Sequence, residues 1–341
     1  MLLEEQFAAY VTERVEGATD VAVTALERIH GGASRQTYRL RLSYEAKGER
    51  FDRPLILRKD PPASLIDTER ETEFSAYSAF FGTTVPVPEP LWLENDEKWV
   101  GTPFFVMHEM QGFEASPTAI GSPPYDQHHE RLAEQKWSIL GEIAKADPVA
   151  LGLDRKFEGV ECCVCWRREL DYWAAKLERD KPAPQPIMDA AVRWCRRTPP
   201  PPPQTLGVVH GDYRTGNFLY DEQGNIHGIL DWEMAHLGDP LEDLAWSLNK
   251  VFHWARDDRS GGLAPRETAI EIWERSAGRK VDPVALHWWE VFSAIKGQAI
   301  WLAAGHEFVK GANRDPVLSV PTLIMANSQD RAVLELLGKL R

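Results

Sequence analysis

The segment between residues 208 and 246, VVHGDYRTGNFLYDEQGNIHGILDWEMAHLGDPLEDLAW, constrains the fold more than any other part of the chain. Two short apolar runs flank a glycine-containing turn, and this pattern predicts a β-hairpin between residues 218 and 230. The return strand of a hairpin ends beside the start of its first strand. We therefore expect Asp231 to lie next to Asn217 and close to Asp212, which precedes the hairpin.

Asp212, Asn217 and Asp231 are the residue types that phosphoryl transfer from ATP requires. A carboxylate must orient the acceptor hydroxyl and take its proton, and Asp212 suits that role. Mg²⁺ prefers carboxylate and amide oxygens, so Asn217 and Asp231 suit the metal-binding roles. An aspartate at a strand end usually has only a structural role, but the whole string of His-Gly-Asp, Asn, hairpin and Asp-Trp-Glu predicts a catalytic site.

This string resembles the catalytic loop of the aminoglycoside phosphotransferase family, a group of small-molecule kinases that includes choline kinase-like proteins. The HGDxxxxN motif of the family corresponds to His210 through Asn217, and its metal-binding aspartate corresponds to Asp231. The resemblance implies an α+β, bilobal, protein-kinase-like fold, with a small antiparallel-sheet lobe followed by a larger, mostly helical lobe. It also implies ATP and Mg²⁺ as cofactors. Asp-Trp-Glu replaces the Asp-Phe-Gly of protein kinases and no activation loop follows, which favours a small-molecule hydroxyl acceptor over a protein.

The N-terminal third of the chain holds candidates for the turn that covers the nucleotide phosphates. A turn between two predicted strands contains Gly31, Gly32 and Ser34, whose backbone amides and hydroxyl can approach phosphates. The turn lacks the G-x-G-x-x-G pattern, so an ordinary hairpin turn also explains it.

A cation for the phosphates is predicted in the strand LILRK, which stands where protein kinases have Val-Ala-Ile-Lys. Alignment of the strand favours Arg58, since relatives of this kind often carry arginine there, and a slip of one residue would give the role to Lys59. The carboxylate that orients this cation is predicted to be Glu73, with Glu69 and Glu71 as alternatives on the same acidic stretch.

The strand that ends near Met107 leads into a linker that contains Glu109 and Met110. In the resemblance, the backbone of this linker binds adenine. The linker therefore separates an N-terminal nucleotide-binding lobe, residues 1–109, from a C-terminal catalytic and substrate-binding lobe, residues 110–341.

Arg214, Glu233 and Lys296 are the candidates for contact with the acceptor. The catalytic loop and the aromatic segment 287–311 resemble the branch related to kinase-like domains fused to acyl-CoA dehydrogenases. Some of that branch phosphorylate 4-hydroxyacyl-CoA, which implies a hydroxyacyl-CoA or a related metabolite as acceptor. An aminoglycoside-type antibiotic kinase and a catalytically silent, nucleotide-binding regulatory protein are the alternatives.

Charge and hydropathy argue against several other classes of protein. The chain has 39 Lys+Arg and 52 Asp+Glu, a net charge of −13, which argues against a nucleic-acid partner. The most apolar long stretch, 288–305, is interrupted by Glu290 and Lys296, so we expect a core helix there and no membrane contact. Glu4 and Glu5 stand where a signal peptide would be basic. We expect a cytoplasmic protein, a monomer or a homodimer.

Hydrophobic periodicity predicts helices at 4–15, 65–81, 127–146 and 163–179, and strands at 21–29, 36–42, 54–59, 91–93 and 103–107. Beyond residue 240 the chain is expected to be mostly helical. Asp239 and Asp243 are predicted to be structural supports of the next helix, with Glu242 in its capping box.

Overall fold

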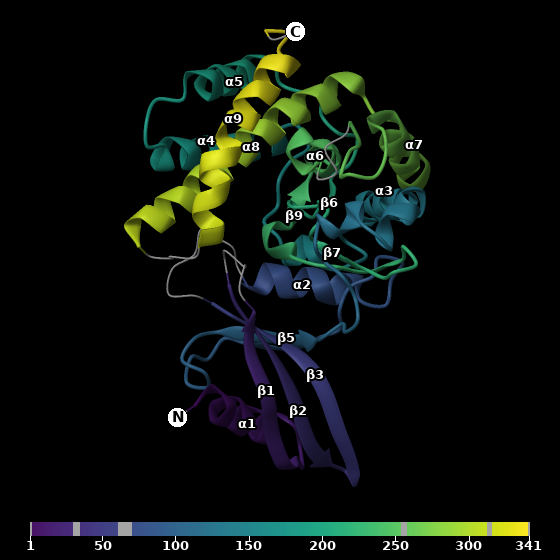
Figure 1. The fold of residues 1–341 in the computed structure, drawn as a ribbon, viewed down its shortest axis with the longest axis vertical. Coiled ribbons are helices and arrows are strands. Elements are labelled where there is room, and N and C mark those ends of the chain that lie inside the picture. The colour runs from purple at the N-terminus through teal and green to yellow at the C-terminus, as the bar shows by residue number, and fades with distance from the viewer. Residues whose placement is uncertain (1, 30–34, 61–69, 254–257, 312–315, 340–341) are drawn as a thin grey trace.

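The computed structural model describes residues 2–29, 35–60, 70–253, 258–311 and 316–339 (Figure 1). An antiparallel sheet occupies the N-terminal part and helices dominate the C-terminal part, which confirms the predicted α+β class. The strands are β1 (Thr19–Ile29), β2 (Gln36–Ala46), β3 (Glu49–Lys59), β4 (Pro90–Glu94), β5 (Phe104–His108), β6 (Gly207–Val209), β7 (Phe218–Tyr220), β8 (Ile226–Ile229) and β9 (His236–Gly238). The α-helices are α1 (Leu3–Arg14), α2 (Arg70–Phe80), α3 (His129–Lys145), α4 (Cys165–Asp180), α5 (Pro186–Arg197), α6 (Leu241–Leu248), α7 (Arg266–Ala277), α8 (Pro283–Lys310) and α9 (Pro316–Leu336).

The N-terminal sheet has the strand order β1-β2-β3-β5-β4, and every neighbouring pair is antiparallel. Alternation of buried and exposed residues along β2 gives the sheet two faces. One face packs on α1, where Phe7 and Tyr10 contact the ring of Phe104. This small core therefore lies on the side of the sheet away from the C-terminal helices (Figure 1).

The other face of the sheet packs on α2, which joins it to the helical part of the molecule. Ala76, Tyr77 and Phe80 of α2 belong to the large core that continues among the C-terminal helices. The ring of Phe80 stacks on Trp232 with centroids 4.7 Å apart. A single helix thus contacts both the sheet and the loop that follows β8.

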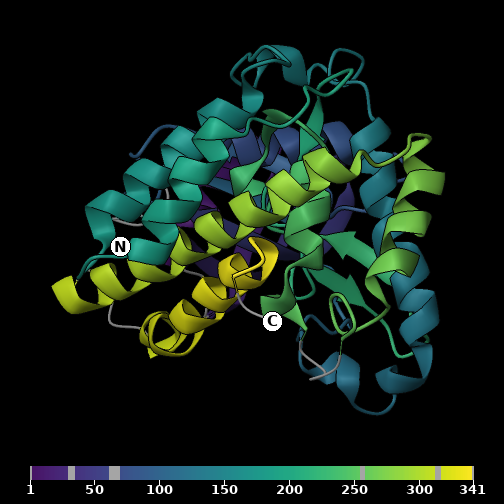
Figure 2. The same cartoon turned by 90° about the horizontal axis from the view of Figure 1, so that it is seen from above.

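The long helix α8 organises the C-terminal part. Seen from above, it crosses the whole helical region, with α4, α5, α6 and α9 packed against it (Figure 2). Its apolar residues are buried in the main core, as the sequence predicts. In the described part of the chain, no helix is both long enough and apolar enough to cross a bilayer.

One helix is not predicted from the sequence, and one local prediction is wrong. Met188, Ala191, Val192 and Cys195 of α5 are buried at helical spacing, but nearby prolines obscure this short amphipathic pattern. The side chain of Glu242 does not form a capping box, because it is buried in ion pairs within the protein.

Candidate active site

A short strand and a glycine position Asp212. After β6, the chain turns through Gly211, whose φ is +85°. A Cβ atom at Gly211 would lie 2.4 Å from the carbonyl oxygen of Met234. Only glycine fits this turn, and the turn presents the next side chain, Asp212, at the end of the strand.

The Asp212 carboxylate accepts hydrogen bonds from three side chains. Asn217 Nδ2 donates to Oδ2 at 2.7 Å, and Trp246 Nε1 donates to Oδ1 at 2.7 Å. Arg214 Nε lies 3.1 Å from Oδ1 and 3.2 Å from Oδ2. The Asp212 side chain is 15% exposed, so it can still be reached from solvent.

The predicted hairpin brings Asn217 and Asp231 together. Strands β7 and β8 pair with Phe218 opposite Ile229, and the amide of Leu230 donates to the carbonyl of Asn217 at 2.8 Å. Asp231 is the next residue. Because the amide nitrogen of Asn217 points at Asp212, its Oδ1 faces away from that carboxylate and is available to a cation.

The backbone of Asp231 is left-handed, with φ +68°, a conformation that aspartate and asparagine tolerate better than most residues. Its amide donates to the hydroxyl of Tyr77 on α2 at 2.9 Å, and its Oδ1 accepts from Arg58 Nη2 at 3.1 Å. Burial opposes ionisation of the Asp231 carboxyl. The Arg58 guanidinium outweighs that effect and holds the pKa of Asp231 below its usual value.

Arg58 contacts the candidate metal ligand Asp231. It pairs with Glu73, which is fully buried and also accepts from Arg35 Nε at 2.9 Å. Arg58 Nε is buried and has no hydrogen-bond partner within the described residues. Lys59, the predicted alternative, points to the opposite face of β3 and donates to the carbonyl of Val100 at 2.8 Å. The geometry therefore does not support a phosphate-binding role for Lys59.

The structure assigns no site role to the remaining N-terminal candidates, which are the alternative carboxylates and the turn residues. Glu71 accepts a hydrogen bond from Asn95 near the surface, so it does not orient Arg58. The predicted phosphate-covering residues Gly31, Gly32 and Ser34, and the alternative carboxylate Glu69, lie outside the described residues.

The predicted adenine-binding linker follows β5. Met107 is buried and pairs with Ile56 across β3 and β5. The Glu109 amide donates to the carbonyl of Pro54 at 3.0 Å, and the Glu109 carboxylate pairs with Arg39. The Met110 side chain packs against Gly228, so the linker contacts the hairpin that carries the candidate metal ligands.

Two of the three predicted acceptor contacts are buried. Lys296 is 1% exposed; its ammonium donates to the carbonyl of Gly211 at 2.7 Å and to Glu242 at 2.9 Å. Lys296 thus lies beneath the catalytic loop, which does not fit the predicted contact with an acceptor. The Glu233 carboxylate is 8% exposed and lies 3.9 Å from Arg58. Arg214 is 27% exposed, which leaves it accessible to a ligand.

Buried groups hold the backbone of the predicted catalytic loop, residues 210–217. The Asp243 carboxylate accepts the amides of His210 at 2.5 Å and Gly211 at 2.9 Å, as expected of a structural support. Burial lowers the pKa of His210 to about 4 and keeps its imidazole neutral. Its Nδ1 accepts the amide of Asp212, so its Nε2 carries the proton that it shares with the carbonyl of Leu230.

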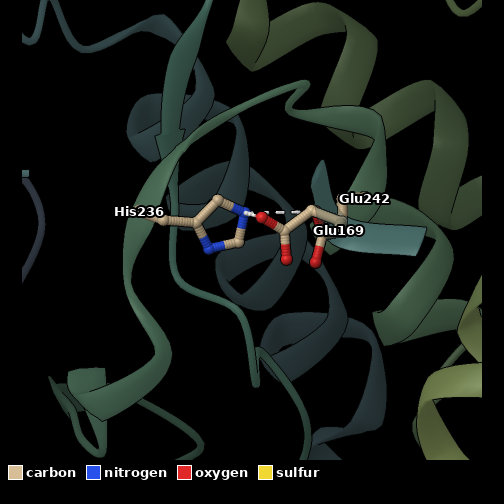
Figure 3. Close-up of side chains that lie close together, drawn as sticks. All are labelled: Glu169, His236 and Glu242. Atoms are coloured by element: carbon tan, nitrogen blue, oxygen red, sulfur yellow. Dashed lines mark hydrogen bonds and ion pairs between the residues drawn. The ribbon is translucent and has the colours of Figure 1, made fainter. Parts of the chain in front are cut away.

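A second buried cluster lies below this loop. Figure 3 shows the imidazole of His236 pointing toward the carboxylates of Glu169 and Glu242. These are metal-binding residue types, but the Lys296 ammonium already contacts Glu242. Arg168 Nε also pairs with Glu169 at 2.9 Å. Three basic side chains thus neutralise the two carboxylates, and the cluster is an ion-pair network that links α4, α6, α8 and β9.

Trp246, Tyr77 and Arg35 are not predicted from the sequence, although they contact Asp212, Asp231 and Glu73 respectively. No local motif marks these three residues, because each contact joins segments far apart in the sequence. Only the placement of Trp246 three residues after Asp243, on the helix expected to support the loop, was visible beforehand.

The donor set fits a nucleotide with Mg²⁺. The oxygens of Asn217 and Asp231 are hard ligands of the kind that Mg²⁺ prefers. The unpartnered Nε of Arg58 is a buried donor suited to a phosphate oxygen.

Comparisons with known proteins agree with this geometry. The model of the phosphotransferase enzyme family (APH) matches residues 25–302. The chain is 28% identical over 298 residues to acyl-CoA dehydrogenase family member 11 of Rattus norvegicus. That match covers 82% of this chain and 36% of the relative, so the chain spans about a third of the relative's length.

Solved structures share the fold. A Ralstonia eutropha protein assigned to the aminoglycoside phosphotransferases has a TM-score of 0.73 at 20% identity, covering 99% of this chain and 98% of that chain. The GDP complex of aminoglycoside 2'-phosphotransferase-IIIa has a TM-score of 0.63 at 15% identity, covering 96% and 98%. These likenesses confirm the predicted kinase-like fold.

Proposed function

Because the chain belongs to the phosphotransferase enzyme family, we propose that it transfers the γ-phosphoryl group of ATP to a hydroxyl of a small molecule. The observation that carries this proposal is the convergence of Asp212 and Asn217 from one loop with Asp231 after β8 and Arg58 of β3. Residues 1–109 would bind the nucleotide and residues 110–341 would supply the catalytic loop and the acceptor site, with Met107, Glu109 and Met110 beside adenine.

Each side chain has a defined role in this proposal. Asp212 orients the acceptor hydroxyl and takes its proton as the new O–P bond forms and the bond from the γ-phosphorus to the bridging oxygen of ADP breaks. Arg58, oriented by Glu73, contacts the nucleotide phosphates. Asn217 and Asp231 would hold Mg²⁺, which neutralises charge on the phosphates.

For the acceptor, we favour a hydroxyacyl-CoA or a related hydroxylated thioester. The support is the similarity to acyl-CoA dehydrogenase family member 11 over 82% of the chain. Arg214 is partly exposed beside the base, and its guanidinium suits an anionic group at the acceptor or at the transferring phosphoryl. Glu233 is better suited to support Arg58 than to contact the acceptor.

The test is a screen of alcohol-bearing metabolites and hydroxyacyl-CoA thioesters with ATP and Mg²⁺, read by mass spectrometry for a phosphorylated product. We expect at least one hydroxylated thioester to be phosphorylated. Asp212→Asn should lower kcat by about 10²- to 10⁴-fold, the usual contribution of a general base, while nucleotide binding is retained. Wild-type turnover by Asp212→Asn would refute the role of the base.

The absence of product across the panel, with nucleotide binding intact, would favour a silent nucleotide-binding protein. Phosphorylation of aminoglycosides in preference to thioesters would favour the antibiotic kinase alternative. Each result separates one of the functions that the family allows.

A further inference from the structure

The short helix α6 contacts the catalytic loop at several points. Asp243, at its first turn, accepts the amides of His210 and Gly211. Glu242 pairs with Lys296, which in turn donates to the carbonyl of Gly211. These bonds fix the backbone that precedes Asp212.

One further contact from α6 reaches the Asp212 side chain itself. Trp246 lies one turn after Glu242, is 2% exposed, and its indole Nε1 is 2.7 Å from Asp212 Oδ1. The indole packs against the ring of Phe252, with centroids 5.1 Å apart, and against the Lys296 ammonium at 5.2 Å. An indole N–H can only donate, so packing of the ring directs one fixed donor at the carboxylate.

The Asp212 carboxylate has about four acceptor positions, and three N–H donors contact it, of which the Arg214 Nε–H is shared between the two oxygens. Asn217 is buried and contacts one oxygen, Trp246 is buried and contacts the other, and Arg214 contacts both. An incoming hydroxyl needs one of these positions. Arg214 is the most exposed of the three donors, so it is the one that can yield.

We propose that Trp246 is a positioning residue for phosphoryl transfer. Its indole N–H, opposite the amide of Asn217, holds the plane of the Asp212 carboxylate, so that the position shared with Arg214 is the one that the acceptor hydroxyl takes. This inference rests on the proposed function, because it assigns Trp246 a part in presenting the proposed base.

The kinetic test compares Trp246→Phe with a matched control, Trp288→Phe. Both changes remove an indole N–H and keep an aromatic ring. Trp288 is buried like Trp246, but its Nε1 donates to the backbone carbonyl of Cys195 in α5 at 3.1 Å and not to Asp212. We expect Trp246→Phe to lower kcat roughly 10- to 100-fold, the effect of losing a hydrogen bond to a charged group, with the KM for ATP unchanged.

Trp288→Phe should keep wild-type kcat at a lowered Tm. Equal kcat values for the two variants would overturn the proposal, and so would a loss in Trp246→Phe confined to KM. If the wild-type protein phosphorylates no acceptor in the panel, the proposed function fails. The hydrogen bond from Trp246 to Asp212 is then tested by a measurement that does not depend on turnover.

This measurement is an NMR spectrum of the indole N–H groups in the ¹⁵N-labelled protein. The Trp246 signal is the one that disappears in Trp246→Phe. Asp212→Ala removes the charged acceptor, so the Trp246 resonance should move upfield. Asp212→Asn retains an acceptor oxygen and should move it less, while the Trp288 resonance stays in place in both variants. A Trp246 resonance that does not respond to Asp212→Ala overturns the proposal.

Discussion

Arg58 and Lys59 are neighbours on β3, yet their cationic groups face opposite sides of the sheet. Arg58 contacts Glu73 and Asp231, whereas Lys59 reaches the carbonyl of Val100. Because side chains alternate along a strand, only one of two successive residues can face the nucleotide. The pair therefore offers an internal comparison for the role of the cation.

We expect Arg58→Met to lower kcat/KM for ATP by roughly 10- to 100-fold, because it removes charge-assisted hydrogen bonds to the phosphates. Lys59→Met should stay within about twofold of wild type. Steady-state kinetics with varied ATP check this prediction. Melting curves of both variants set the assay temperature at which each is folded, because Arg58→Met also removes a partner from the buried Glu73 and from Asp231. A larger loss in Lys59→Met than in Arg58→Met would contradict the assignment.

The residues that sequence could identify are those whose spacing is local. Asp212, Asn217 and Asp231 lie on one loop and hairpin, so the motif and the turn pattern predict that they meet. The choice between Arg58 and Lys59 depended on the register of β3, because a slip of one residue exchanges the two faces. Trp246 and Tyr77 were missed since their partners are remote in sequence.

At the scale of secondary structure, the ion-pair network of Glu169, His236, Glu242 and Lys296 joins β9 to α4, α6 and α8. Burial opposes the charge on His236, but Glu169 and then Glu242 outweigh it and raise its pKa to about 9. A raised pKa means that the folded protein holds a proton which the unfolded chain releases near pH 6.5.

The contribution of His236 to the free energy of unfolding should therefore be complete below about pH 6.5 and lost as the pH rises through about 9. We expect wild-type protein to lose up to about 3 kcal/mol more than His236→Gln between these limits. Urea unfolding at several pH values measures this difference. Glu169→Gln should reduce it, and identical pH profiles for wild type and His236→Gln would contradict the prediction.

The sequence predicts the long helix α8 from its apolar pattern. It does not predict the short helix α5, which lies beside prolines. The apolar pattern of α8 predicts a core helix, but it does not show whether Lys296 within that helix contacts an acceptor or a buried partner. A single lysine in an apolar helix can either line a ligand pocket or form an ion pair with a buried carboxylate. Only the packing of α6 on α8, which brings Glu242 beside it, distinguishes the two.

For the whole molecule, α2 connects the sheet to the helical part through the loop after β8. Tyr77 accepts the amide of Asp231, and Phe80 stacks on Trp232. Both contacts lie beside the candidate metal ligands. Closure of the sheet over a nucleotide would therefore be coupled to the backbone that carries Asp231.

Tyr77→Phe should weaken the affinity for Mg·ATP several-fold, because the Asp231 amide loses its acceptor and its loop loses a link to the sheet. The matched control is Tyr220→Phe, which removes a hydroxyl that donates to the carbonyl of Ser116 at 2.7 Å. Each variant should lose about 1 kcal/mol of stability. Titration calorimetry with a non-hydrolysable analogue should separate the two, and equal affinities would contradict the coupling.

The left-handed backbone at Asp231 restricts the residues that evolution can place there. Glycine, asparagine and aspartate adopt this conformation at little cost, whereas most other side chains would strain the loop. Codons for aspartate and asparagine differ by a single base, and asparagine would preserve the turn while removing the negative charge. If Asp231 holds Mg²⁺ as proposed, a folded but inactive protein lies one transition mutation away, and position 231 is the place to look when homologous genes are sorted into active and inactive copies.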